Sequence, residues 1–469
     1  MKEQHVRRIL AEASEHAIDF YENLTERHVA ATAGYDELRS RLSRPLPDEG
    51  VDGSAVIHDL VRDVEGGLLA SGGGRFFGWV VGGSVPAALA ADWLVSAWDQ
   101  NAAIHACSPA EGILEEITGE WLKDILGIPS ASSFAFTTGC QMAHFTALAA
   151  ARHRLLAERG IDVERTGLFG APSIRVLTGE HRHESVKRAL RFLGFGTDSL
   201  RALPCGADGA LDLEALSREL SGTPDSPTIV ILQAGDIDTG VFDAFEPACA
   251  LAHEHGAWVH VDGAFGLWAH AAPEYRHYLA GCEQADSWAT DGHKWLNVPF
   301  DSGFVFIRDR RAHAAAMSAT ASYLIPPEGS ARDQMSFNPE WSRRGRAVPA
   351  YAALRSLGRR GVAQLVERCC GFAERLVQEI GSLPGAEVVS PARINQGLVR
   401  FLSEDANHDR RTEEVMESVR DSGEAWFGGT SWRGMRAMRI SVCSFRTTDE
   451  DVDRAVEAVR HAIAACRTT

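Results

Sequence analysis

The sequence lacks the features that would place it in a membrane, on nucleic acid or among disulfide-bonded proteins. Positive charge is in deficit, with 47 Lys and Arg against 64 Asp and Glu and a net charge of −17, which argues against a general binder of nucleic acid or anionic membranes. Gly, Pro, Ser and Asp interrupt the stretch FFGWVVGGSVPAALAADWLVSAW, so it lacks the run of about 20 apolar residues that a membrane span needs. The nine cysteines show no CxxC spacing, and we expect reduced thiols without a zinc site or disulfide framework. The charged N-terminus, MKEQHVRRILAEASEHAIDF, has no signal-peptide core, so we expect a cytoplasmic protein.

Lysine is scarce around the stretch ADSWATDGHKWLNVPFDSGF, residues 285–304. Lys294 is the only lysine for a long way in either direction, and it stands beside Trp295 and Leu296. A lysine is costly to bury unless it is paired or used chemically. An apolar wall would lower its pKa and make it a nucleophilic amine able to form a Schiff base. A surface lysine at a loop tip is the alternative.

The pattern along the 469 residues predicts an α/β protein with appended segments. Hydrophobic residues make up 45% and charged residues 24%, as in an ordinary globular protein with a sizeable core. Amphipathic helices are expected from about residue 5 to 42. Short apolar runs (IRVLTG, TIVILQAG, AWVHVDGAF, SGFVFIR) then alternate with helical stretches, which indicates a mostly parallel sheet covered on both faces. A long helix, further strands and a last helix capped by Thr448 predict a smaller α+β domain. We therefore expect segments 1–95, 96–345 and 346–469.

Reactive side chains follow several of these strand candidates, where ligands gather in open α/β sheets. Asp262 ends AWVHVDGAF, although an aspartate there could equally cap the next helix. The turn Thr138–Gly139–Cys140 leads into a helix whose free N–H groups could hold phosphate, but many helices begin this way without binding anything. His181 and His183 lie beside another helix start, as caps, surface groups or a ring for stacking on a planar cofactor.

Taken together, these features match the needs of pyridoxal 5'-phosphate (PLP). A lysine carries PLP as an imine, and a carboxylate keeps the pyridine nitrogen protonated so that the ring acts as an electron sink. A helix start holds the phosphate, and a ring stacks on the cofactor. The motifs HVDGAFG, DGHKWLN and HESVKRA resemble those of the group II PLP-dependent decarboxylases, which include the aromatic amino acid, histidine and glutamate decarboxylases. The likeness runs from GRFFGWVVGGSVPAALAADWL to MRISVCSF.

The resemblance implies a fold, an assembly and a role for each matching residue. It implies PLP-dependent transferase fold type I, like aspartate aminotransferase, and a homodimer clasped by the N-terminal helices with active sites at the interface. Lys294 would form the internal aldimine, Asp262 would pair with the pyridine nitrogen, and His183, in a pattern with Ser185 and Lys187, would stack on the ring. The other implied cofactor contacts are Ala264 on the opposite face, Thr138, Gly139 and Cys140 at the phosphate, and His293 beside the imine and phosphate. Cys140 and Gln141 stand where relatives often carry small polar residues, and the role of Asp291, often a small amide in relatives, stays open.

The resemblance implies PLP-dependent decarboxylation of an L-amino acid to its amine. In relatives, a loop after the lysine strand usually supplies a Tyr that donates a proton to Cα. Here the corresponding region, YLIPPEGSARDQMSFNPEWSRRGR, contains no Tyr after Tyr323, and Gln334 or Phe337 stands near that position. Related enzymes without that Tyr form an aldehyde instead, so an oxidative decarboxylase or a carbon–carbon lyase is the alternative. Tyr323, His105 or water could also donate the proton.

Two further expectations concern the side chain of the substrate and a metal-dependent alternative function. Trp79, Val80, Val81 and Gly82 resemble the stretch that lines the substrate pocket, and they favour an aromatic or apolar side chain. An acidic substrate would need a cation such as Arg343, Arg344 or Arg346, unless these are ion-paired. A metal-dependent hydrolase or binding protein using His260, Asp262, Asp291 and His293 is the unrelated alternative, and it leaves Lys294 unexplained.

Overall fold

The computed structural model describes residues 3–223, 225–318 and 331–466, which form two compact units. The large unit comprises residues 82–374 and 390–397. The small unit combines the residues up to Val81 with residues 375–389 and those from Leu398 onward. The N-terminal helices and the C-terminal strands therefore share a unit, whereas the predicted limits at 95/96 and 345/346 stay predictions.

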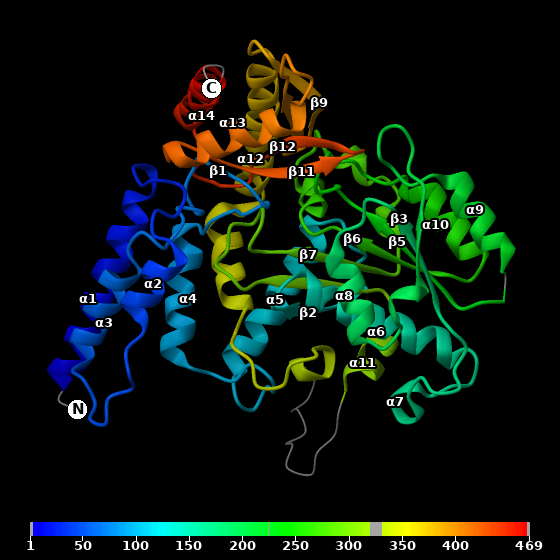
Figure 1. The fold of residues 1–469 in the computed structure, drawn as a ribbon. Helices are drawn as coiled ribbons and strands as arrows, with labels where there is room; N and C mark the ends of the chain where they lie inside the picture. Colours follow the sequence, from blue (N-terminus) through cyan, green and yellow to red (C-terminus); the bar gives the residue numbers. More distant parts are fainter. Residues whose placement is uncertain (1–2, 224, 319–330, 467–469) are drawn as a thin grey trace. The chain divides into compact units, whose positions relative to one another are not determined.

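The large unit contains the predicted mostly parallel sheet, of which Figure 1 labels β2, β3, β5, β6 and β7. Its seven strands have the order β2-β8-β7-β6-β5-β3-β4. Strand β8 is antiparallel to both β2 and β7, and the other neighbouring pairs are parallel. The four apolar runs predicted as strands became β3, β5, β6 and β8. The strands are β2 (Ser133–Thr137), β3 (Arg175–Gly179), β4 (Leu200–Leu203), β5 (Thr228–Gln233), β6 (Trp258–Asp262), β7 (Ser287–Asp291) and β8 (Gly303–Ile307).

Helices connect these strands and cover the sheet. Helix α6 (Cys140–Ala157) packs across β6, β7 and β8, and its alanine-rich surface buries residues such as Ala143, Ala147 and Ala151. Small side chains allow the helix to lie close to the sheet. The other helices are α4 (Pro86–Trp98), α5 (Pro109–Ile125), α7 (Val163–Thr166), α8 (Glu184–Phe192), α9 (Leu213–Gly222), α10 (Phe245–Glu254) and α11 (Arg310–Met317). Short 3-10 helices are η2 (Thr197–Ser199), η3 (Gly266–Ala271), η4 (Arg276–Leu279), η5 (Cys282–Gln284) and η6 (Gln334–Phe337).

The small unit is built on a five-stranded sheet with the order β1-β11-β12-β10-β9. Its first strand is β1 (Phe76–Phe77), which pairs in parallel with the start of β11. The other strands are β9 (Ala386–Arg393), β10 (Gln396–Phe401), β11 (Trp426–Trp432) and β12 (Met435–Ser441), and β9 and β10 extend past the limit between the units. Helix α12 (Ala347–Gly381) also crosses that limit, and its helical backbone is interrupted at Gly358, where φ is 63°.

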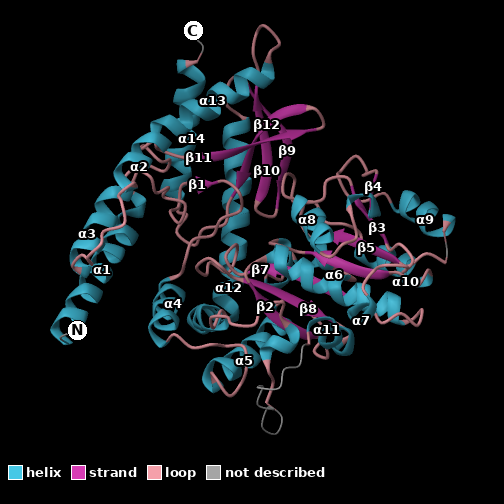
Figure 2. Ribbon diagram, turned by 60° about the horizontal axis from the view of Figure 1, so that its bottom comes forward, coloured by secondary structure: helices cyan, strands magenta, loops and turns pink. Residues whose placement is uncertain are grey.

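Helices of the small unit confirm the one predicted cap, Thr448, and add one helix that was not predicted. Helices α1 (Glu3–Glu22) and α3 (Gly53–Val64) lie side by side in both views (Figure 2). The sequence did not predict α3, which begins within the Pro/Gly/Asp-rich break because the Asp52 carboxylate accepts hydrogen bonds from Ser54 N and Ala55 N. Thr448 caps the last helix through a capping box with Asp451, as expected. The remaining helices are η1 (Asn23–Thr25), α2 (Tyr35–Leu42), α13 (His408–Ser422) and α14 (Asp449–Ala465). Among the described residues, no helix combines the length and apolarity that crossing a bilayer requires.

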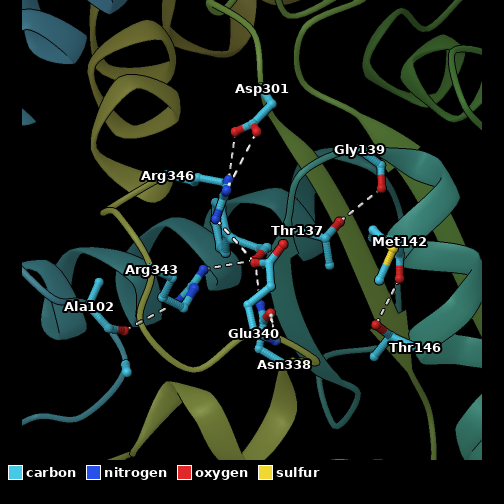
Figure 3. A network of polar contacts seen from close by, with 12 residues as sticks. Ala102, Thr137, Gly139, Met142, Thr146, Asp301, Asn338, Glu340, Arg343 and Arg346 are labelled. Carbon is cyan, nitrogen blue, oxygen red and sulfur yellow. Dashed lines mark hydrogen bonds and ion pairs between the residues drawn. The ribbon is translucent and has the colours of Figure 1, made fainter. Parts of the chain in front are cut away.

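A buried ion pair joins the segment before α12 to α5 in the large unit. The Arg343 Nη1 lies 2.7 Å from Glu115 Oε2, and the two side chains are 0% and 1% exposed. The same guanidinium donates to the carbonyl oxygen of Ala102 (Figure 3) and to that of Phe136. A buried pair stabilises a fold only when such additional hydrogen bonds offset its desolvation.

We expect Arg343→Met to lower the free energy of unfolding by about 3–5 kcal/mol, because it leaves Glu115 as an unpaired buried charge. The urea midpoint measures this change. The control is Arg344→Met, which removes a more exposed pair with Asp92 and should cost about 0–1 kcal/mol. An equal loss in the two variants would contradict the assignment.

Candidate active site

Lys294 follows strand β7 and lies next to a carboxylate of that strand. Its Nζ is 3.2 Å from Asp291 Oδ2 and 5.9 Å from the centre of the Phe265 ring. Burial has the largest single effect on the pKa of Lys294 and lowers it, but Asp291, Cys140 and Asp262 together raise this pKa above its usual value. The expectation that apolar surroundings lower this pKa is therefore wrong for the free amine. The sequence did not reveal that Asp291 lies beside Lys294.

We expect Asp291→Asn to lower the pKa of Lys294, since it removes the opposite charge that lies 3.2 Å from the amine. At a given pH more of the amine is then neutral, so Lys294 reacts faster with an aldehyde. The pH dependence of the rate of PLP uptake by the PLP-free protein, followed by absorbance, measures this effect. Asp301→Asn is the matched control, because Asp301 pairs with Arg346 instead. An unchanged pH profile in Asp291→Asn would refute this electrostatic role.

Asp262 is the last residue of β6 and is buried. Its Oδ1 accepts a hydrogen bond from Ala264 N at 3.2 Å, and its Oδ2 lies 3.5 Å from His144 Nε2. Burial acts to raise the pKa of Asp262, but His144 and, to a lesser extent, His183 and Lys294 hold it well below the usual value. Asp262 is therefore a carboxylate that is buried yet ionised.

The start of α6 forms a narrow turn beside the lysine. Gly303 of β8 approaches Gly139 so closely that a Cβ at Gly303 would overlap the Gly139 backbone. The amide N of Cys140 donates to Asp291 Oδ1 at 2.6 Å. The carboxylate of Asp291 thus takes one of the free N–H groups of the helix start, with Lys294 as its cationic neighbour.

Two histidine rings interact with the charged groups around Lys294. His183 caps α8, and its Nδ1 accepts from Ser185 N at 3.2 Å and lies 2.7 Å from Ser185 Oγ. The exposed ring interacts electrostatically with Asp262 and Lys294. His293 accepts a hydrogen bond from Ser302 N, stacks on the Phe300 ring at 4.3 Å, and has its Nε2 3.6 Å from Asp291 Oδ1. Burial lowers the pKa of His293.

Other residues predicted for the site lie in different surroundings. His181 Nε2 lies 4.0 Å from Glu180 Oε1, and Lys187 pairs with Glu184 at 3.8 Å. Gly82 lies against the backbone of Lys294, where a Cβ would overlap the lysine carbonyl oxygen. The structure thus brings together Lys294, Asp262, His183, His293, Ala264, Cys140, Gly139 and Gly82 in the large unit.

The predicted substrate residues before Gly82 belong to the small unit. Trp79 and Val80 have φ values of 51° and 57°, a left-handed conformation that is rare for a β-branched residue. Trp79 packs on Trp426 with ring centroids 4.4 Å apart and is 55% exposed. Val80 is buried. Backbone strain of this kind clusters at ligand sites, and the substrate role of Trp79, Val80 and Val81 stays a prediction.

The three arginines considered for an acidic substrate are all ion-paired. Arg343 pairs with Glu115 and Arg344 with Asp92. Arg346 lies between Asp301 and Glu340, at 2.7 and 3.2 Å (Figure 3). Their charges are already matched by carboxylates of the large unit.

The structure also shows where the residues considered near the proton-donor position lie. Tyr323 is the exception, because it lies outside the described residues. Gln334 is buried and donates to Gly112 O. Phe337 is buried beneath the guanidinium of Arg332, 3.9 Å from its ring centroid. Both are therefore core residues. The backbone N of His105 donates to Asp333.

The metal alternative is not supported by a common ligand group. Within residues 3–223, 225–318 and 331–466, potential ligand atoms converge in two groups, Cys140–His144–Asp262 and Glu180–His181–Cys205. His260, Asp291 and His293 belong to neither. His144, which the sequence analysis missed, instead contacts both Asp262 and His260. Its signal was the spacing from Cys140, one helical turn earlier, opposite His260 and Asp262 on alternate positions of one strand.

Comparison with known proteins gives the family. Residues 36–403 match the model of the "Pyridoxal-dependent decarboxylase conserved domain". The chain belongs to this family. It is a PLP-dependent carboxy-lyase.

Relatives of the PLP-dependent decarboxylase extend over nearly its full length. An aromatic-L-amino-acid decarboxylase of Bacillus atrophaeus is 26% identical over 96% of this chain and 93% of the relative. An L-2,4-diaminobutyrate decarboxylase of Rhizobium meliloti (strain 1021) is 26% identical over 97% and 91%. A phenylacetaldehyde synthase of Petunia hybrida is 24% identical over 94% and 91%. The crystal structure of Oryza sativa TDC with PLP and tryptamine covers 99% of both chains with a TM-score of 0.93 at 23% identity, which confirms the fold.

The site of this decarboxylase fits its cofactor in the chemistry of its donors. Lys294 offers an amine for a covalent bond, Asp262 an ionised carboxylate for a protonated ring nitrogen, and the start of α6 offers backbone N–H groups for a phosphate. Asp291 is not one of these cofactor-holding groups. Its carboxylate instead accepts a hydrogen bond from the Cys140 amide, one of the N–H groups at the start of α6.

Proposed function

We propose that this PLP-dependent decarboxylase converts an aromatic or other apolar L-amino acid to its amine and CO2, with Lys294 as the covalent anchor of the cofactor. The observation that carries this proposal is that the Lys294 amine, the ionised Asp262 and the exposed ring of His183 interact with one another. PLP supplies an electron sink for the pair of electrons that CO2 leaves behind.

We assign the following roles to the chain's own residues. Asp262 holds a proton at the ring nitrogen, because it stays ionised despite its burial. His183 stacks on one ring face with Ala264 on the other, and its hydrogen bonds with Ser185 fix the imidazole orientation. Thr138, Gly139, Cys140 and His293 bind the phosphate. Asp291 accepts a hydrogen bond from Cys140 N and orients the Lys294 amine.

The charge distribution supports an apolar substrate. An acidic side chain needs an unmatched cation, and Arg343, Arg344 and Arg346 are each paired with a carboxylate. We propose that Trp79, Val80, Val81 and Gly82 line the side-chain pocket. The similarity to an aromatic-L-amino-acid decarboxylase favours the same substrate class.

The alternative product is an aldehyde, and one observation favours it. Gln334 and Phe337, which stand where a proton-donating Tyr is expected, are buried in the core, and a relative is a phenylacetaldehyde synthase. We retain the amine as the main product, since the other relatives reported above are decarboxylases.

A panel of L-amino acids assayed together for CO2, amine, ammonia and peroxide tests this function. We expect CO2 and amine in equal amounts, with the highest turnover for aromatic or aliphatic substrates. Peroxide in proportion to CO2 would establish the aldehyde alternative. Absence of CO2 from every amino acid would overturn the decarboxylase proposal in favour of a lyase.

We also propose a homodimer with active sites at the subunit interface, formed partly through α1 and α3. Apolar side chains on these helices are exposed, namely Val6, Leu10, Ile18, Val56 and Leu60. A second copy of the chain would cover them, and such exposed apolar groups mark interaction surfaces. A cytoplasmic location is likewise a proposal, which cell fractionation tests.

We expect the double variant Leu10→Glu and Leu60→Glu to lose at least about tenfold in dimer affinity, because each change places a charge in the apolar contact. Light scattering over a dilution series gives the dissociation constant. Gln4→Glu adds a charge to the exposed surface of the same helix and should leave the dimer intact. An unchanged affinity in the double variant would remove α1 and α3 from the interface.

A further inference from the structure

A chain of buried polar side chains runs behind Asp262, on the side away from the strand end. His144 Nε2 lies 3.5 Å from Asp262 Oδ2, and His144 Nδ1 lies 2.8 Å from His260 Nε2. His260 Nδ1 is 2.9 Å from Ser287 Oγ, which also accepts from Trp258 Nε1 at 2.9 Å. His144, His260 and Ser287 are each 0% exposed. Buried imidazoles with every ring nitrogen in contact with a polar atom form a specified network.

The local geometry of two elements creates this chain. Cys140 and His144 are one turn apart on α6, so they share a helix face. His260 and Asp262 alternate on β6 and share a strand face. Because α6 packs against β6, the pairs meet, with Cys140 Sγ 3.9 Å from Asp262 Oδ1 and the two rings in an edge-on contact.

The positions of the protons on the two imidazole rings determine whether an N–H group or a lone pair faces Asp262. One proton lies between His144 Nδ1 and His260 Nε2. If His260 donates it, neutral His144 carries its own proton on Nε2, facing Asp262. If His144 donates it, His144 can be doubly protonated and again present Nε2–H. Otherwise the Nε2 lone pair faces a carboxylate oxygen at 3.5 Å, which is repulsive, and the S–H of Cys140, whose Sγ is also 3.5 Å away, is only a weak donor to it. The favourable arrangements both direct an N–H toward Asp262.

We propose that His144, oriented by His260 and Ser287, is a positioning residue that keeps Asp262 ionised and thereby keeps the pyridine nitrogen of the cofactor protonated. This inference rests on the proposed role of Asp262. It adds a residue that touches neither substrate nor cofactor, and it assigns a purpose to two buried histidines.

The electrostatics of the site agree with this arrangement. Burial and the neighbouring His144 lower the pKa of His260 to about 3, so His260 is a neutral ring that orients His144. His144 contributes more than the other ionisable groups to the lowered pKa of Asp262. The other titratable groups that interact with Asp262 are Cys140, His183 and Lys294.

Solution 15N NMR of the full-length protein loaded with PLP labelled at the pyridine nitrogen tests the inference. Loss of the partner of a carboxylate raises its pKa by about one to three units. We therefore expect the pH midpoint for deprotonation of the pyridine nitrogen to fall by about one unit or more in His144→Leu. His144→Gln retains an N–H donor and should give an intermediate midpoint. A role limited to packing would reduce stability and leave the midpoint in place.

A second matched pair tests the outer part of the chain. His260→Gln keeps a side-chain amide that can donate to or accept from His144 Nδ1 and should titrate like wild type, whereas His260→Leu removes this hydrogen-bond partner and should lower the midpoint. These variants also provide a measurement if His144→Leu does not fold. Wild-type midpoints in both His144→Leu and His260→Leu would overturn the inference.

The proposed function and this inference fail in distinguishable ways. Wild-type protein that takes up no PLP, or forms no borohydride-stable bond at Lys294, would overturn both. Wild-type protein that forms this bond, together with histidine variants of unaltered titration, would overturn the role of His144 alone.

Discussion

Lys294→Ala is expected to abolish covalent attachment of PLP and to lower decarboxylation by about three orders of magnitude or more, the scale seen when a covalent nucleophile is removed. Borohydride treatment of the wild type should add PLP to the peptide that contains Lys294, as measured by mass spectrometry. The labelled residue is easy to identify because the chain has only four lysines, at positions 2, 123, 187 and 294.

Lys187→Ala is the matched control for this experiment. Lys187 has an exposed side chain paired with Glu184, so its loss should change neither the labelled peptide nor the turnover. Borohydride labelling of Lys187 in the wild type, or full activity of Lys294→Ala, would contradict the proposed anchor.

Asp262→Asn should lower turnover by about a hundred- to a thousandfold while the protein still takes up PLP. Asparagine keeps the shape of the side chain but removes the charge that holds a proton at the pyridine nitrogen, and loss of a directed electrostatic contact costs about this much. Single-turnover CO2 release and the pH dependence of the holoenzyme absorbance measure the two effects.

The control for Asp262→Asn is another buried aspartate of the large unit. Asp243 accepts hydrogen bonds from Leu211 N and Gln233 N, and burial raises its pKa to about 6. Asp243→Asn should reduce stability without the large loss of turnover. Equal losses of turnover would indicate that Asp262 acts only through the fold.

The ionised Asp262 also gives stability a pH dependence of known sign. Its pKa is lowered in the folded state. Its contribution is therefore complete above the unfolded value of about 3.9 and is lost as the pH falls through the lower folded value. Asp262→Asn should abolish this part of the acid sensitivity.

The sequence predicted the parallel sheet because its strands are short apolar runs between helices, a pattern that burial on both faces requires. It also predicted that Lys294 and Asp262 belong to one site, because each lies at the end of a strand candidate. The structure shows that the two groups interact, and their roles stay predictions. The three-dimensional partners were not predictable from spacing. The effect of Asp291 on Lys294 depends on a turn, and the contacts of His144 depend on α6 crossing β6. The helix α3 was missed because its N-cap, Asp52, lies in a segment with the composition of a loop.

The pairing of β1 with β11 has a consequence for the order in which the protein acquires its structure during synthesis. Phe76 and Phe77 leave the ribosome about 350 residues before their partners Trp426 and Phe427. At a synthesis rate of about 5–20 residues per second, β1 lacks its partner strand β11 for tens of seconds. The whole of the large unit, including Asp262 and Lys294, is synthesised within that interval. The nascent chain can therefore assemble the lysine site early, whereas the sheet that joins its two ends is completed last.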